Sequence, residues 1–247
     1  MTVMKGTVLI TGASRGIGRA CALAFGKAGW CVAANYHTNK EAAHSLLCEL
    51  KDLHVSAGIF QADVSDAVQV ARMYGEVRER FGNVTVLVNN AGAAQQKLFT
   101  DITEADWQRI FDINVKGMFL CTRAVFPDMI SRKQGCVINL SSIWGIAGAS
   151  CEVHYSAAKA AVIGFTKALA KEAGPSGIRV NCIAPGVVET DMLAGIDEAA
   201  RQELAEETPL GCLGTPDDIA QAAVFLAGEG GMFITGQILS PNGGLVI

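Results

Sequence analysis

Short apolar runs alternate with longer helical segments along almost the whole chain, and this alternation limits the fold more than any other feature. The runs end in Gly, Pro, Asn or Asp, as buried strands commonly do. Helical segments between them supply the crossover connections that parallel strands need. We therefore expect an α/β fold with about seven parallel strands and helices on both faces of one sheet. The predicted strands are Thr7–Ile10, Cys31–Ala34, Ser56–Gln61, Val84–Val88, Cys136–Leu140, Ile178–Ile183 and Gln237–Leu239.

No repeat, low-complexity tract or Pro/Ser-rich linker interrupts this alternation. We expect a single doubly wound, Rossmann-type domain over residues 1–247. The irregular stretch from Thr190 to Pro216 follows the sixth strand, so it is predicted to overhang a ligand site as a lid, or to be an ordinary surface helix. The predicted helices are Arg19–Lys27, Glu41–Leu53, a segment capped by Ser65 or Asp66 that runs to Phe81, Glu104 to about Arg132, Tyr155 to about Lys171, and Asp197–Glu207.

Composition excludes several classes of function. A net charge of −4 gives no basic surface for nucleic acid or an anionic membrane. No apolar run approaches the roughly 20 residues that span a bilayer, and no signal-peptide pattern opens the chain, so we expect a cytoplasmic protein. The eight cysteines lack a C-x-x-C pair and are expected to be reduced thiols. The four histidines lack ligand spacing, which predicts no metal site.

A glycine-rich turn joins the first predicted strand to the first helix. Its spacing is Gly-x-x-x-Gly-x-Gly, which permits a tight turn and lets a diphosphate approach the backbone. The helix that follows offers free N–H groups and the positive end of its dipole. A glycine-rich turn without a ligand is the alternative interpretation. The predicted cofactor contacts of this turn are Gly12, Ser14, Arg15, Gly16, Ile17 and Gly18.

Further motifs follow in order along the chain: Asn89-Asn90-Ala91-Gly92, then Ser142, Tyr155-x-x-x-Lys159 and Pro185-Gly186. With the glycine turn, they make the chain resemble the short-chain dehydrogenase/reductase family from about Lys5 to its last residue. The resemblance implies a nicotinamide-dependent oxidoreductase. It also implies cofactor contacts at Asp63 and Val64 beside the adenine, at Asn90, Ala91 and Gly92 in the cleft, and at Pro185, Gly186, Val188 and Thr190 around the nicotinamide.

Tyr155 and Lys159 lie four residues apart on a predicted helix and therefore share a face. A neighbouring ammonium favours the phenolate, so Lys159 is expected to lower the pKa of Tyr155 and fit it for acid/base work. The resemblance implies that Ser142 bonds the substrate oxygen and that Asn114 holds a water leading from Lys159 to solvent. A cofactor-binding regulator without turnover is a second class of function. The presence of all four residues, Asn114, Ser142, Tyr155 and Lys159, argues against a regulator of this kind.

The expected cofactor is NADP(H) rather than NAD(H). The end of the second strand, Ala34-Asn35-Tyr36-His37-Thr38, has no carboxylate for a ribose hydroxyl, while Arg15 and Lys40 offer cations for a 2′-phosphate. Asn35 is counted among the cofactor residues. His37 departs from the arginine that many relatives carry.

Two substrate classes stay open, each a ketone carried on a protein. Likeness in Tyr155–Lys159, Val188–Met192 and Thr235–Gln237 favours 3-oxoacyl groups on acyl carrier protein. Likeness in Ala94–Asp101 and Gly148–His154 favours the 5-aminopentanone modification on a lysine of elongation factor P. Glu152, a predicted substrate contact, would suit an ammonium better than a thioester. The resemblance also implies a homotetramer packed through the helices that contain Phe119 and Tyr155.

Overall fold

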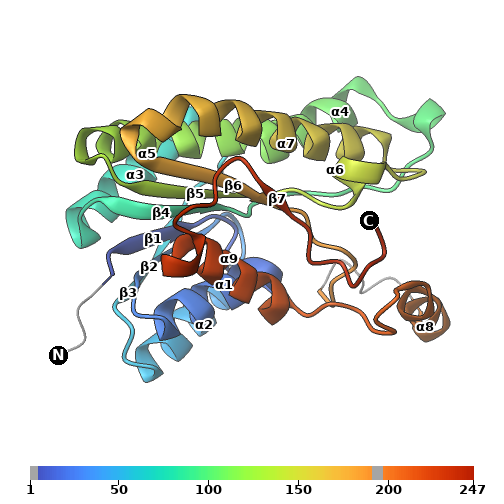
Figure 1. Ribbon diagram of the computed structural model, residues 1–247, viewed down its shortest axis with the longest axis horizontal. Helices are drawn as coiled ribbons and strands as arrows, with labels where there is room; N and C mark the ends of the chain where they lie inside the picture. Colours follow the sequence, from blue (N-terminus) through green and yellow to red (C-terminus); the bar gives the residue numbers. More distant parts are fainter. Residues whose placement is uncertain (1–4, 191–196) are drawn as a thin grey trace.

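A computed structural model describes residues 5–190 and 197–247, and within these ranges the strands form one parallel sheet. The order β3-β2-β1-β4-β5-β6-β7 runs outward on both sides from β1 and β4, as in a doubly wound sheet. The expected α/β architecture is confirmed (Figure 1). The strands are β1 (Thr7–Ile10), β2 (Cys31–Tyr36), β3 (Ala57–Gln61), β4 (Val84–Asn89), β5 (Gly135–Leu140), β6 (Ile178–Ile183) and β7 (Ile238–Leu239).

Helices cover both faces of the sheet (Figure 1). One layer contains α1 (Gly16–Lys27), α2 (Lys40–Asp52) and α9 (Pro216–Ala227), and the other contains α3 (Ala67–Phe81), α5 (Gly117–Arg132) and α7 (Val153–Ala173). The remaining helices are α4 (Glu104–Phe111), the π-helical turn Asp112–Lys116, α6 (Trp144–Ala147), α8 (Glu198–Glu207) and the 3₁₀ turns Phe99–Asp101, Gly174–Ser176 and Glu229–Gly231.

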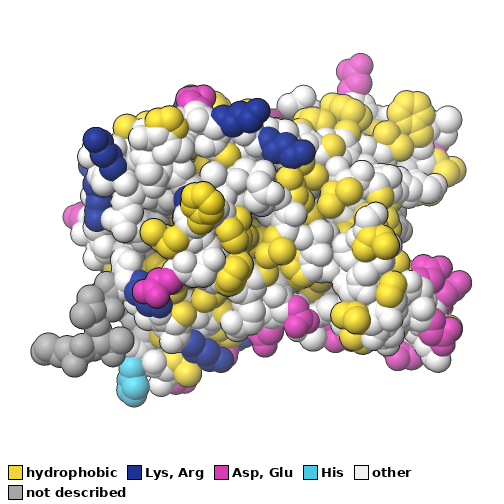
Figure 2. Space-filling model, in the orientation of Figure 1, with side chains coloured by type: hydrophobic (Ala, Val, Ile, Leu, Met, Phe, Trp, Pro, Cys, Tyr) yellow, Lys and Arg dark blue, Asp and Glu magenta, His cyan; other side chains and the backbone are white. Residues whose placement is uncertain are grey.

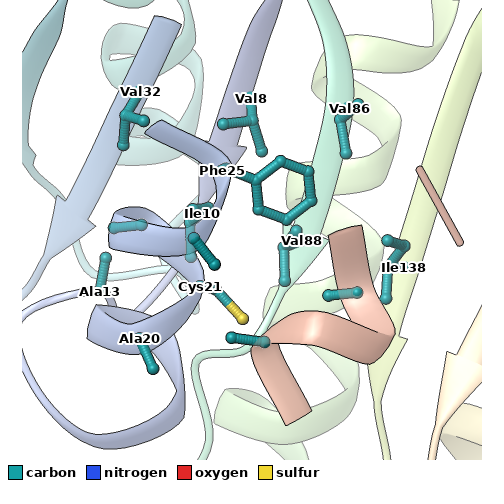
Figure 3. Packing of buried hydrophobic residues seen from close by; sticks show 14 of the residues in the cluster. Val8, Ile10, Ala13, Ala20, Cys21, Phe25, Val32, Val86, Val88 and Ile138 are labelled. Atoms are coloured by element: carbon teal, nitrogen blue, oxygen red, sulfur yellow. The ribbon is translucent and has the colours of Figure 1, made fainter. Parts of the chain in front are cut away.

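The core lies between the central strands and these two layers. Figure 3 shows Phe25 of α1 over Val8 and Val88, which point toward it from β1 and β4. All three side chains are fully buried. Burying a side chain of this size stabilises a fold by about 1.5–3 kcal/mol, so this packing holds the first strand and first helix in fixed register. The turn between the strand and the helix is therefore held at both of its ends.

Several elements differ from the sequence-based expectation, among them the short helix α6, which was not expected. The single helix predicted from Glu104 to Arg132 contains the π-helical turn Asp112–Lys116, because an extra residue is accommodated where Asn114 turns inward. Helix α9 was not predicted, although Thr215-Pro216-Asp217-Asp218 is a capping box with Pro at the first helical position. That signal was available in the sequence.

All eight cysteines lie in the described ranges and none forms a disulfide there, and five of them are buried. In the described ranges, no helix has the length and apolarity needed to cross a bilayer. Part of the predicted lid, residues 191–196, lies outside the described residues, and Asp191 and Met192 with it. Helix α8, predicted as Asp197–Glu207, forms with Asp197 as its cap.

Candidate active site

The glycine turn lies between the carboxyl end of β1 and the start of α1. Gly12 and Gly16 have φ angles of +63° and +53°, in the left-handed region that a side chain disfavours. A Cβ added at Gly18 would lie 2.4 Å from Asn90 Nδ2 and 2.4 Å from the carbonyl oxygen of Gly12. The turn is therefore packed so closely on its neighbours that only glycine fits. This is a cradle of the kind that brings backbone N–H groups to a diphosphate.

Side chains from two other strand ends hold the turn in place. Asn90 donates from Nδ2 to the carbonyl oxygens of Thr11 (2.9 Å) and Gly12 (3.1 Å), and the Thr11 hydroxyl accepts the backbone N–H groups of Asn90 and Ala91. Asn35 accepts from the Gly12 N–H at 3.1 Å and donates to carbonyls of β2 and β3. Because Asn35 is 2% exposed, its side chain supports the turn from beneath. The sequence analysis did not single out Thr11.

Three other predicted cofactor residues follow the ends of β3 and β6. The Asp63 carboxylate accepts the backbone N–H (2.9 Å) and hydroxyl (2.7 Å) of Ser65 and lies 3.8 Å from His37 Nε2. Val64 is buried against Gly117. Thr190 lies opposite the turn, since a Cβ added at Gly16 would be 3.5 Å from its Cγ2.

The segment after β6 lies beside the end of β5. The carbonyl oxygen of Pro185 accepts the Ile143 N–H at 3.0 Å, and Gly186 donates to the Pro241 carbonyl. A Cβ at Gly186 would be 2.7 Å from Asn242 Cα, so this position too is closely packed. Val188 is buried and pairs with Gly214. Together with the turn, these strand ends fit a dinucleotide stretched across the carboxyl edge of the sheet.

Ser142 and Tyr155 are both buried, at 8% exposed, and the Ser142 hydroxyl is close enough to Tyr155 to lower the pKa of its phenol. Ser142 Oγ also accepts the Trp144 N–H at 3.2 Å. Its neighbour Ser141 instead donates its hydroxyl to the carbonyl oxygen of Lys159 at 2.8 Å. Of the two serines, Ser142 is therefore the one whose side chain acts on the tyrosine.

Lys159 extends beneath Tyr155, with Nζ 5.5 Å from the centre of the phenol ring and 2.9 Å from the Leu140 carbonyl oxygen that accepts from it. Asn114 approaches from the π-helical turn and donates Nδ2 to the carbonyls of Ala93 (2.8 Å) and Ile110 (2.9 Å). Its Oδ1 is buried and accepts no hydrogen bond from the described residues. A Cβ added at Gly92 would be 2.8 Å from that oxygen and 3.4 Å from Lys159 Nζ. The two side chains thus flank the same small space over Gly92.

Burial dominates the ionisation of both groups. It raises the pKa of Tyr155 to about 12, against a lowering by the Ser142 hydrogen bond, and the Glu152 carboxylate raises it further. Burial lowers the pKa of Lys159 to about 8, while Cys182 raises it. The expectation that the pKa of Tyr155 lies below its usual value is wrong, because burial raises it by more than nearby groups lower it. The tyrosine is a phenol at neutral pH and can donate a proton.

Glu152 lies at the start of α7, half-buried beside the tyrosine. Burial raises the pKa of its carboxyl, and a hydrogen bond from Gln96 opposes that shift. Its charge acts on Tyr155, so the two side chains are close. The sequence analysis named Gln96 only as part of a segment, because the loop that brings it to Glu152 has no periodic pattern.

Comparison with known proteins agrees with this geometry. A family model described as "Enoyl-(Acyl carrier protein) reductase" matches residues 12–246. The chain is 40% identical to "3-oxoacyl-[acyl-carrier-protein] reductase FabG" of Staphylococcus aureus strain MW2 over 242 residues, 98% of each chain. The chain belongs to the short-chain dehydrogenase/reductase family.

Two other relatives extend the comparison. The FabG reductase of Thermotoga maritima is 40% identical over 97% of each chain. "Uncharacterized oxidoreductase YmfI" of Bacillus subtilis strain 168 is 42% identical over 242 residues, 98% of this chain and 99% of the relative. As a short-chain dehydrogenase/reductase, the protein is an oxidoreductase that acts on keto or hydroxyl groups with a nicotinamide cofactor.

Proposed function

We propose that the protein reduces a ketone to a secondary alcohol with NADPH, with Tyr155 as the proton donor. The buried phenol next to Ser142 carries the proposal, because its raised pKa keeps the proton on Tyr155 at neutral pH until a carbonyl oxygen takes it. A bound reduced nicotinamide supplies the hydride to the carbonyl carbon. Ser142 donates a second hydrogen bond to the same oxygen and orients it.

Lys159 and Asn114 then take part in returning a proton to Tyr155. The ammonium of Lys159 lies below the phenol ring and stabilises the phenolate left after proton transfer. Asn114 Oδ1 faces the space over Gly92 that it shares with Lys159, so a proton can pass from the lysine toward solvent along this side. Asn114, Ser142, Tyr155 and Lys159 are the catalytic set in this proposal.

The preference for NADPH over NADH follows from the end of β2. His37 has a side chain that is 61% exposed, Lys40 is exposed at the start of α2, and Arg15 lies in the glycine turn. The neighbouring carboxylate, Asp63, already accepts two hydrogen bonds from Ser65. A 2′-phosphate would therefore meet cations here rather than an unengaged acid.

The proposed substrate is a 3-oxoacyl thioester on acyl carrier protein, because two of the relatives named above are reductases of that substrate.

We also propose a single domain and a homotetramer packed through α5 and α7. Phe119 of α5 is 41% exposed in the single chain, which is consistent with such an interface.

A ketone that carries an ammonium, such as the 5-aminopentanone group on a lysine of elongation factor P, is the second candidate. Glu152 favours it, because a half-buried carboxylate near Tyr155 would pair with an ammonium and offers nothing to a thioester. Acidic side chains also gather over α8, at the same end of the molecule as α6 (Figure 2), and would repel an acidic carrier.

The test is NADPH and NADH oxidation by the purified protein with an acetoacetyl thioester and with the aminopentanone-modified factor, using wild type and Glu152→Gln. Turnover of the thioester that survives Glu152→Gln supports the acyl-carrier substrate. Turnover of the modified factor alone, weakened about tenfold or more in kcat/KM by Glu152→Gln, supports the amino-ketone. Faster turnover with NADH than with NADPH would contradict the cofactor assignment.

A further inference from the structure

A chain of polar side chains next to the candidate site is not used by the mechanism above. His154, fully buried and adjacent to Tyr155, meets Gln95 at 3.1 Å between Nε2 and Oε1. Gln95 Nε2 donates to Asp106 Oδ1 at 2.9 Å, and Lys97 Nζ donates to Asp106 Oδ2 at 2.7 Å. The Thr103 hydroxyl and N–H add two more bonds to that carboxylate. The chain links α7 to α4 through the loop that follows β4.

The charge on Asp106 determines every orientation in this chain. Lys97 and Thr103 hold the pKa of Asp106 well below its usual range, so it is a carboxylate and can only accept hydrogen bonds. The amide NH₂ of Gln95 must then face Asp106, which leaves its carbonyl oxygen toward His154. His154 must therefore donate from Nε2, and its Nδ1, buried without a partner among the described residues, carries no proton.

The loop held by this chain, residues 93–97, is hydrogen-bonded at both ends to segments next to the candidate site. Asn114 donates to the carbonyl of Ala93 at its start, and the Lys97 N–H donates to the carbonyl of Cys151 at 2.7 Å. Between these two anchors lies Gln96, whose side chain is close enough to Glu152 to lower the pKa of its carboxyl. Gln95 and Lys97 therefore fix the backbone on either side of the residue that contacts the Glu152 carboxylate.

We propose that the His154–Gln95–Asp106–Lys97 chain is a positioning device, which holds the loop 93–97 against the start of α7 and so determines how tightly the ketone binds. The inference rests on the proposed ketone reduction. None of the four side chains is assigned a contact with the reacting atoms. Disrupting this chain of side chains is therefore expected to change KM. It is expected to leave the rate of the chemical step unchanged.

The first test is Gln95→Leu, which keeps the size of the side chain and removes both of its hydrogen bonds. KM for the ketone is expected to rise about tenfold, with kcat changed by less than about threefold and the Kd for NADPH, measured by fluorescence titration, unchanged. Hydrogen exchange at the Lys97 amide is expected to quicken about tenfold or more, because its bond to Cys151 opens more often. Thr100→Ala, in the 3₁₀ turn just after this loop, removes a hydroxyl that donates to Asp101, and as the matched control it is expected to leave all four quantities unchanged.

A charge exchange provides the second test. Gln95→Glu alone places a second carboxylate against that of Asp106, and it is expected to raise KM as Gln95→Leu does. The Gln95→Glu, Asp106→Asn double variant restores both hydrogen bonds of residue 95, since His154 still donates to it and the amide introduced at position 106 donates in the reversed direction. Its KM is therefore expected to return to within about threefold of wild type. A kcat that falls with KM unchanged would overturn the proposal, as would a double variant with no recovery. Faster amide exchange without a change in KM would also overturn it. If wild type reduces no ketone, the amide exchange still reports whether the chain holds the loop, and the proposed function fails separately.

Discussion

Tyr155 and Lys159 are both buried, and burial shifts their pKa values in opposite directions, to about 12 and about 8. At neutral pH the tyrosine keeps its proton and most of the lysine keeps its charge. This pair is therefore prepared for the reductive direction, in which the enzyme gives a proton to a carbonyl oxygen and the lysine stabilises the phenolate that results. The same groups would need a higher pH to begin the reverse reaction.

The rate of ketone reduction should follow the charge of Lys159. We expect kcat/KM to be constant near pH 7 and to fall about tenfold per pH unit above pH 8, because the free enzyme loses the lysine proton there while Tyr155 stays protonated. Lys159→Arg, whose charge persists, should keep some activity and move this decline above pH 10. A pH–rate profile measures both. A wild-type profile that is flat to pH 10 would contradict the assignment.

That Tyr155, Lys159 and Asn114 lie close together could be predicted from the sequence, but the ionisation of the first two could not. The helical spacing of Tyr155 and Lys159 correctly predicts that they are neighbours. The spacing carries no information about burial, which is the largest cause of the pKa shift of each residue. Gln96 and Thr11 were missed for a related reason, since each acts through a loop whose partner lies far along the chain.

At the scale of elements, the turn between β1 and α1 depends on close packing that a single methyl group would disturb. A Cβ at Gly18 would contact the Asn90 side chain and the Gly12 carbonyl at 2.4 Å, so one of them must move. Both belong to the hydrogen bonds that shape the turn. The β1–α1 unit is thus a rigid platform, and its rigidity comes from β4 as much as from its own glycines.

Gly18→Ala is expected to raise the Kd for NADPH about tenfold or more and to destabilise the fold by roughly 1–3 kcal/mol through overpacking. Gly75→Ala is the matched control, because Gly75 lies within α3 with open space around the added Cβ. It should leave the Kd unchanged and stabilise the fold by about 0.5–1 kcal/mol. Fluorescence titration and chemical denaturation measure the two effects. Equal Kd values for both variants would show that the turn does not carry the cofactor.

Most elements could be predicted from the periodicity of apolar residues, and the exceptions have physical causes. The π-helical turn Asp112–Lys116 has no distinct pattern, because it arises from the inward hydrogen bonds of Asn114. The apolar pattern along the chain predicts which segments are strands but not which strands lie next to each other in the sheet. The order around β1 and β4 follows from crossover handedness and packing, which place the motifs of four strand ends along one edge.

At the scale of the whole molecule, the buried histidine links stability to pH. Burial lowers the pKa of His154 below 6.5, although Asp106 opposes the shift. The unfolded chain therefore binds this proton first as pH falls. The contribution of His154 to stability is complete above pH 6.5 and declines below it, until the pH passes the lowered pKa of the folded state.

The melting temperature should reveal this link. Between pH 6.5 and 5.5, wild type is expected to lose about 2–4 °C more than His154→Gln, whose amide nitrogen can take the place of Nε2 as a donor toward Gln95 but cannot be protonated. Differential scanning calorimetry at several pH values measures the difference. Parallel curves for the two proteins would mean that His154 binds its proton equally well in the folded and unfolded chain.

The central claim is that Tyr155 gives its proton to a ketone, and single-turnover NADPH oxidation by Tyr155→Phe tests it most directly. Phenylalanine keeps the ring above Lys159 and removes only the hydroxyl. The account predicts that the variant binds NADPH with the Kd of wild type and reduces an activated ketone about 10²–10⁴-fold more slowly. A Tyr155→Phe protein that reduces the ketone within threefold of the wild-type rate would contradict it.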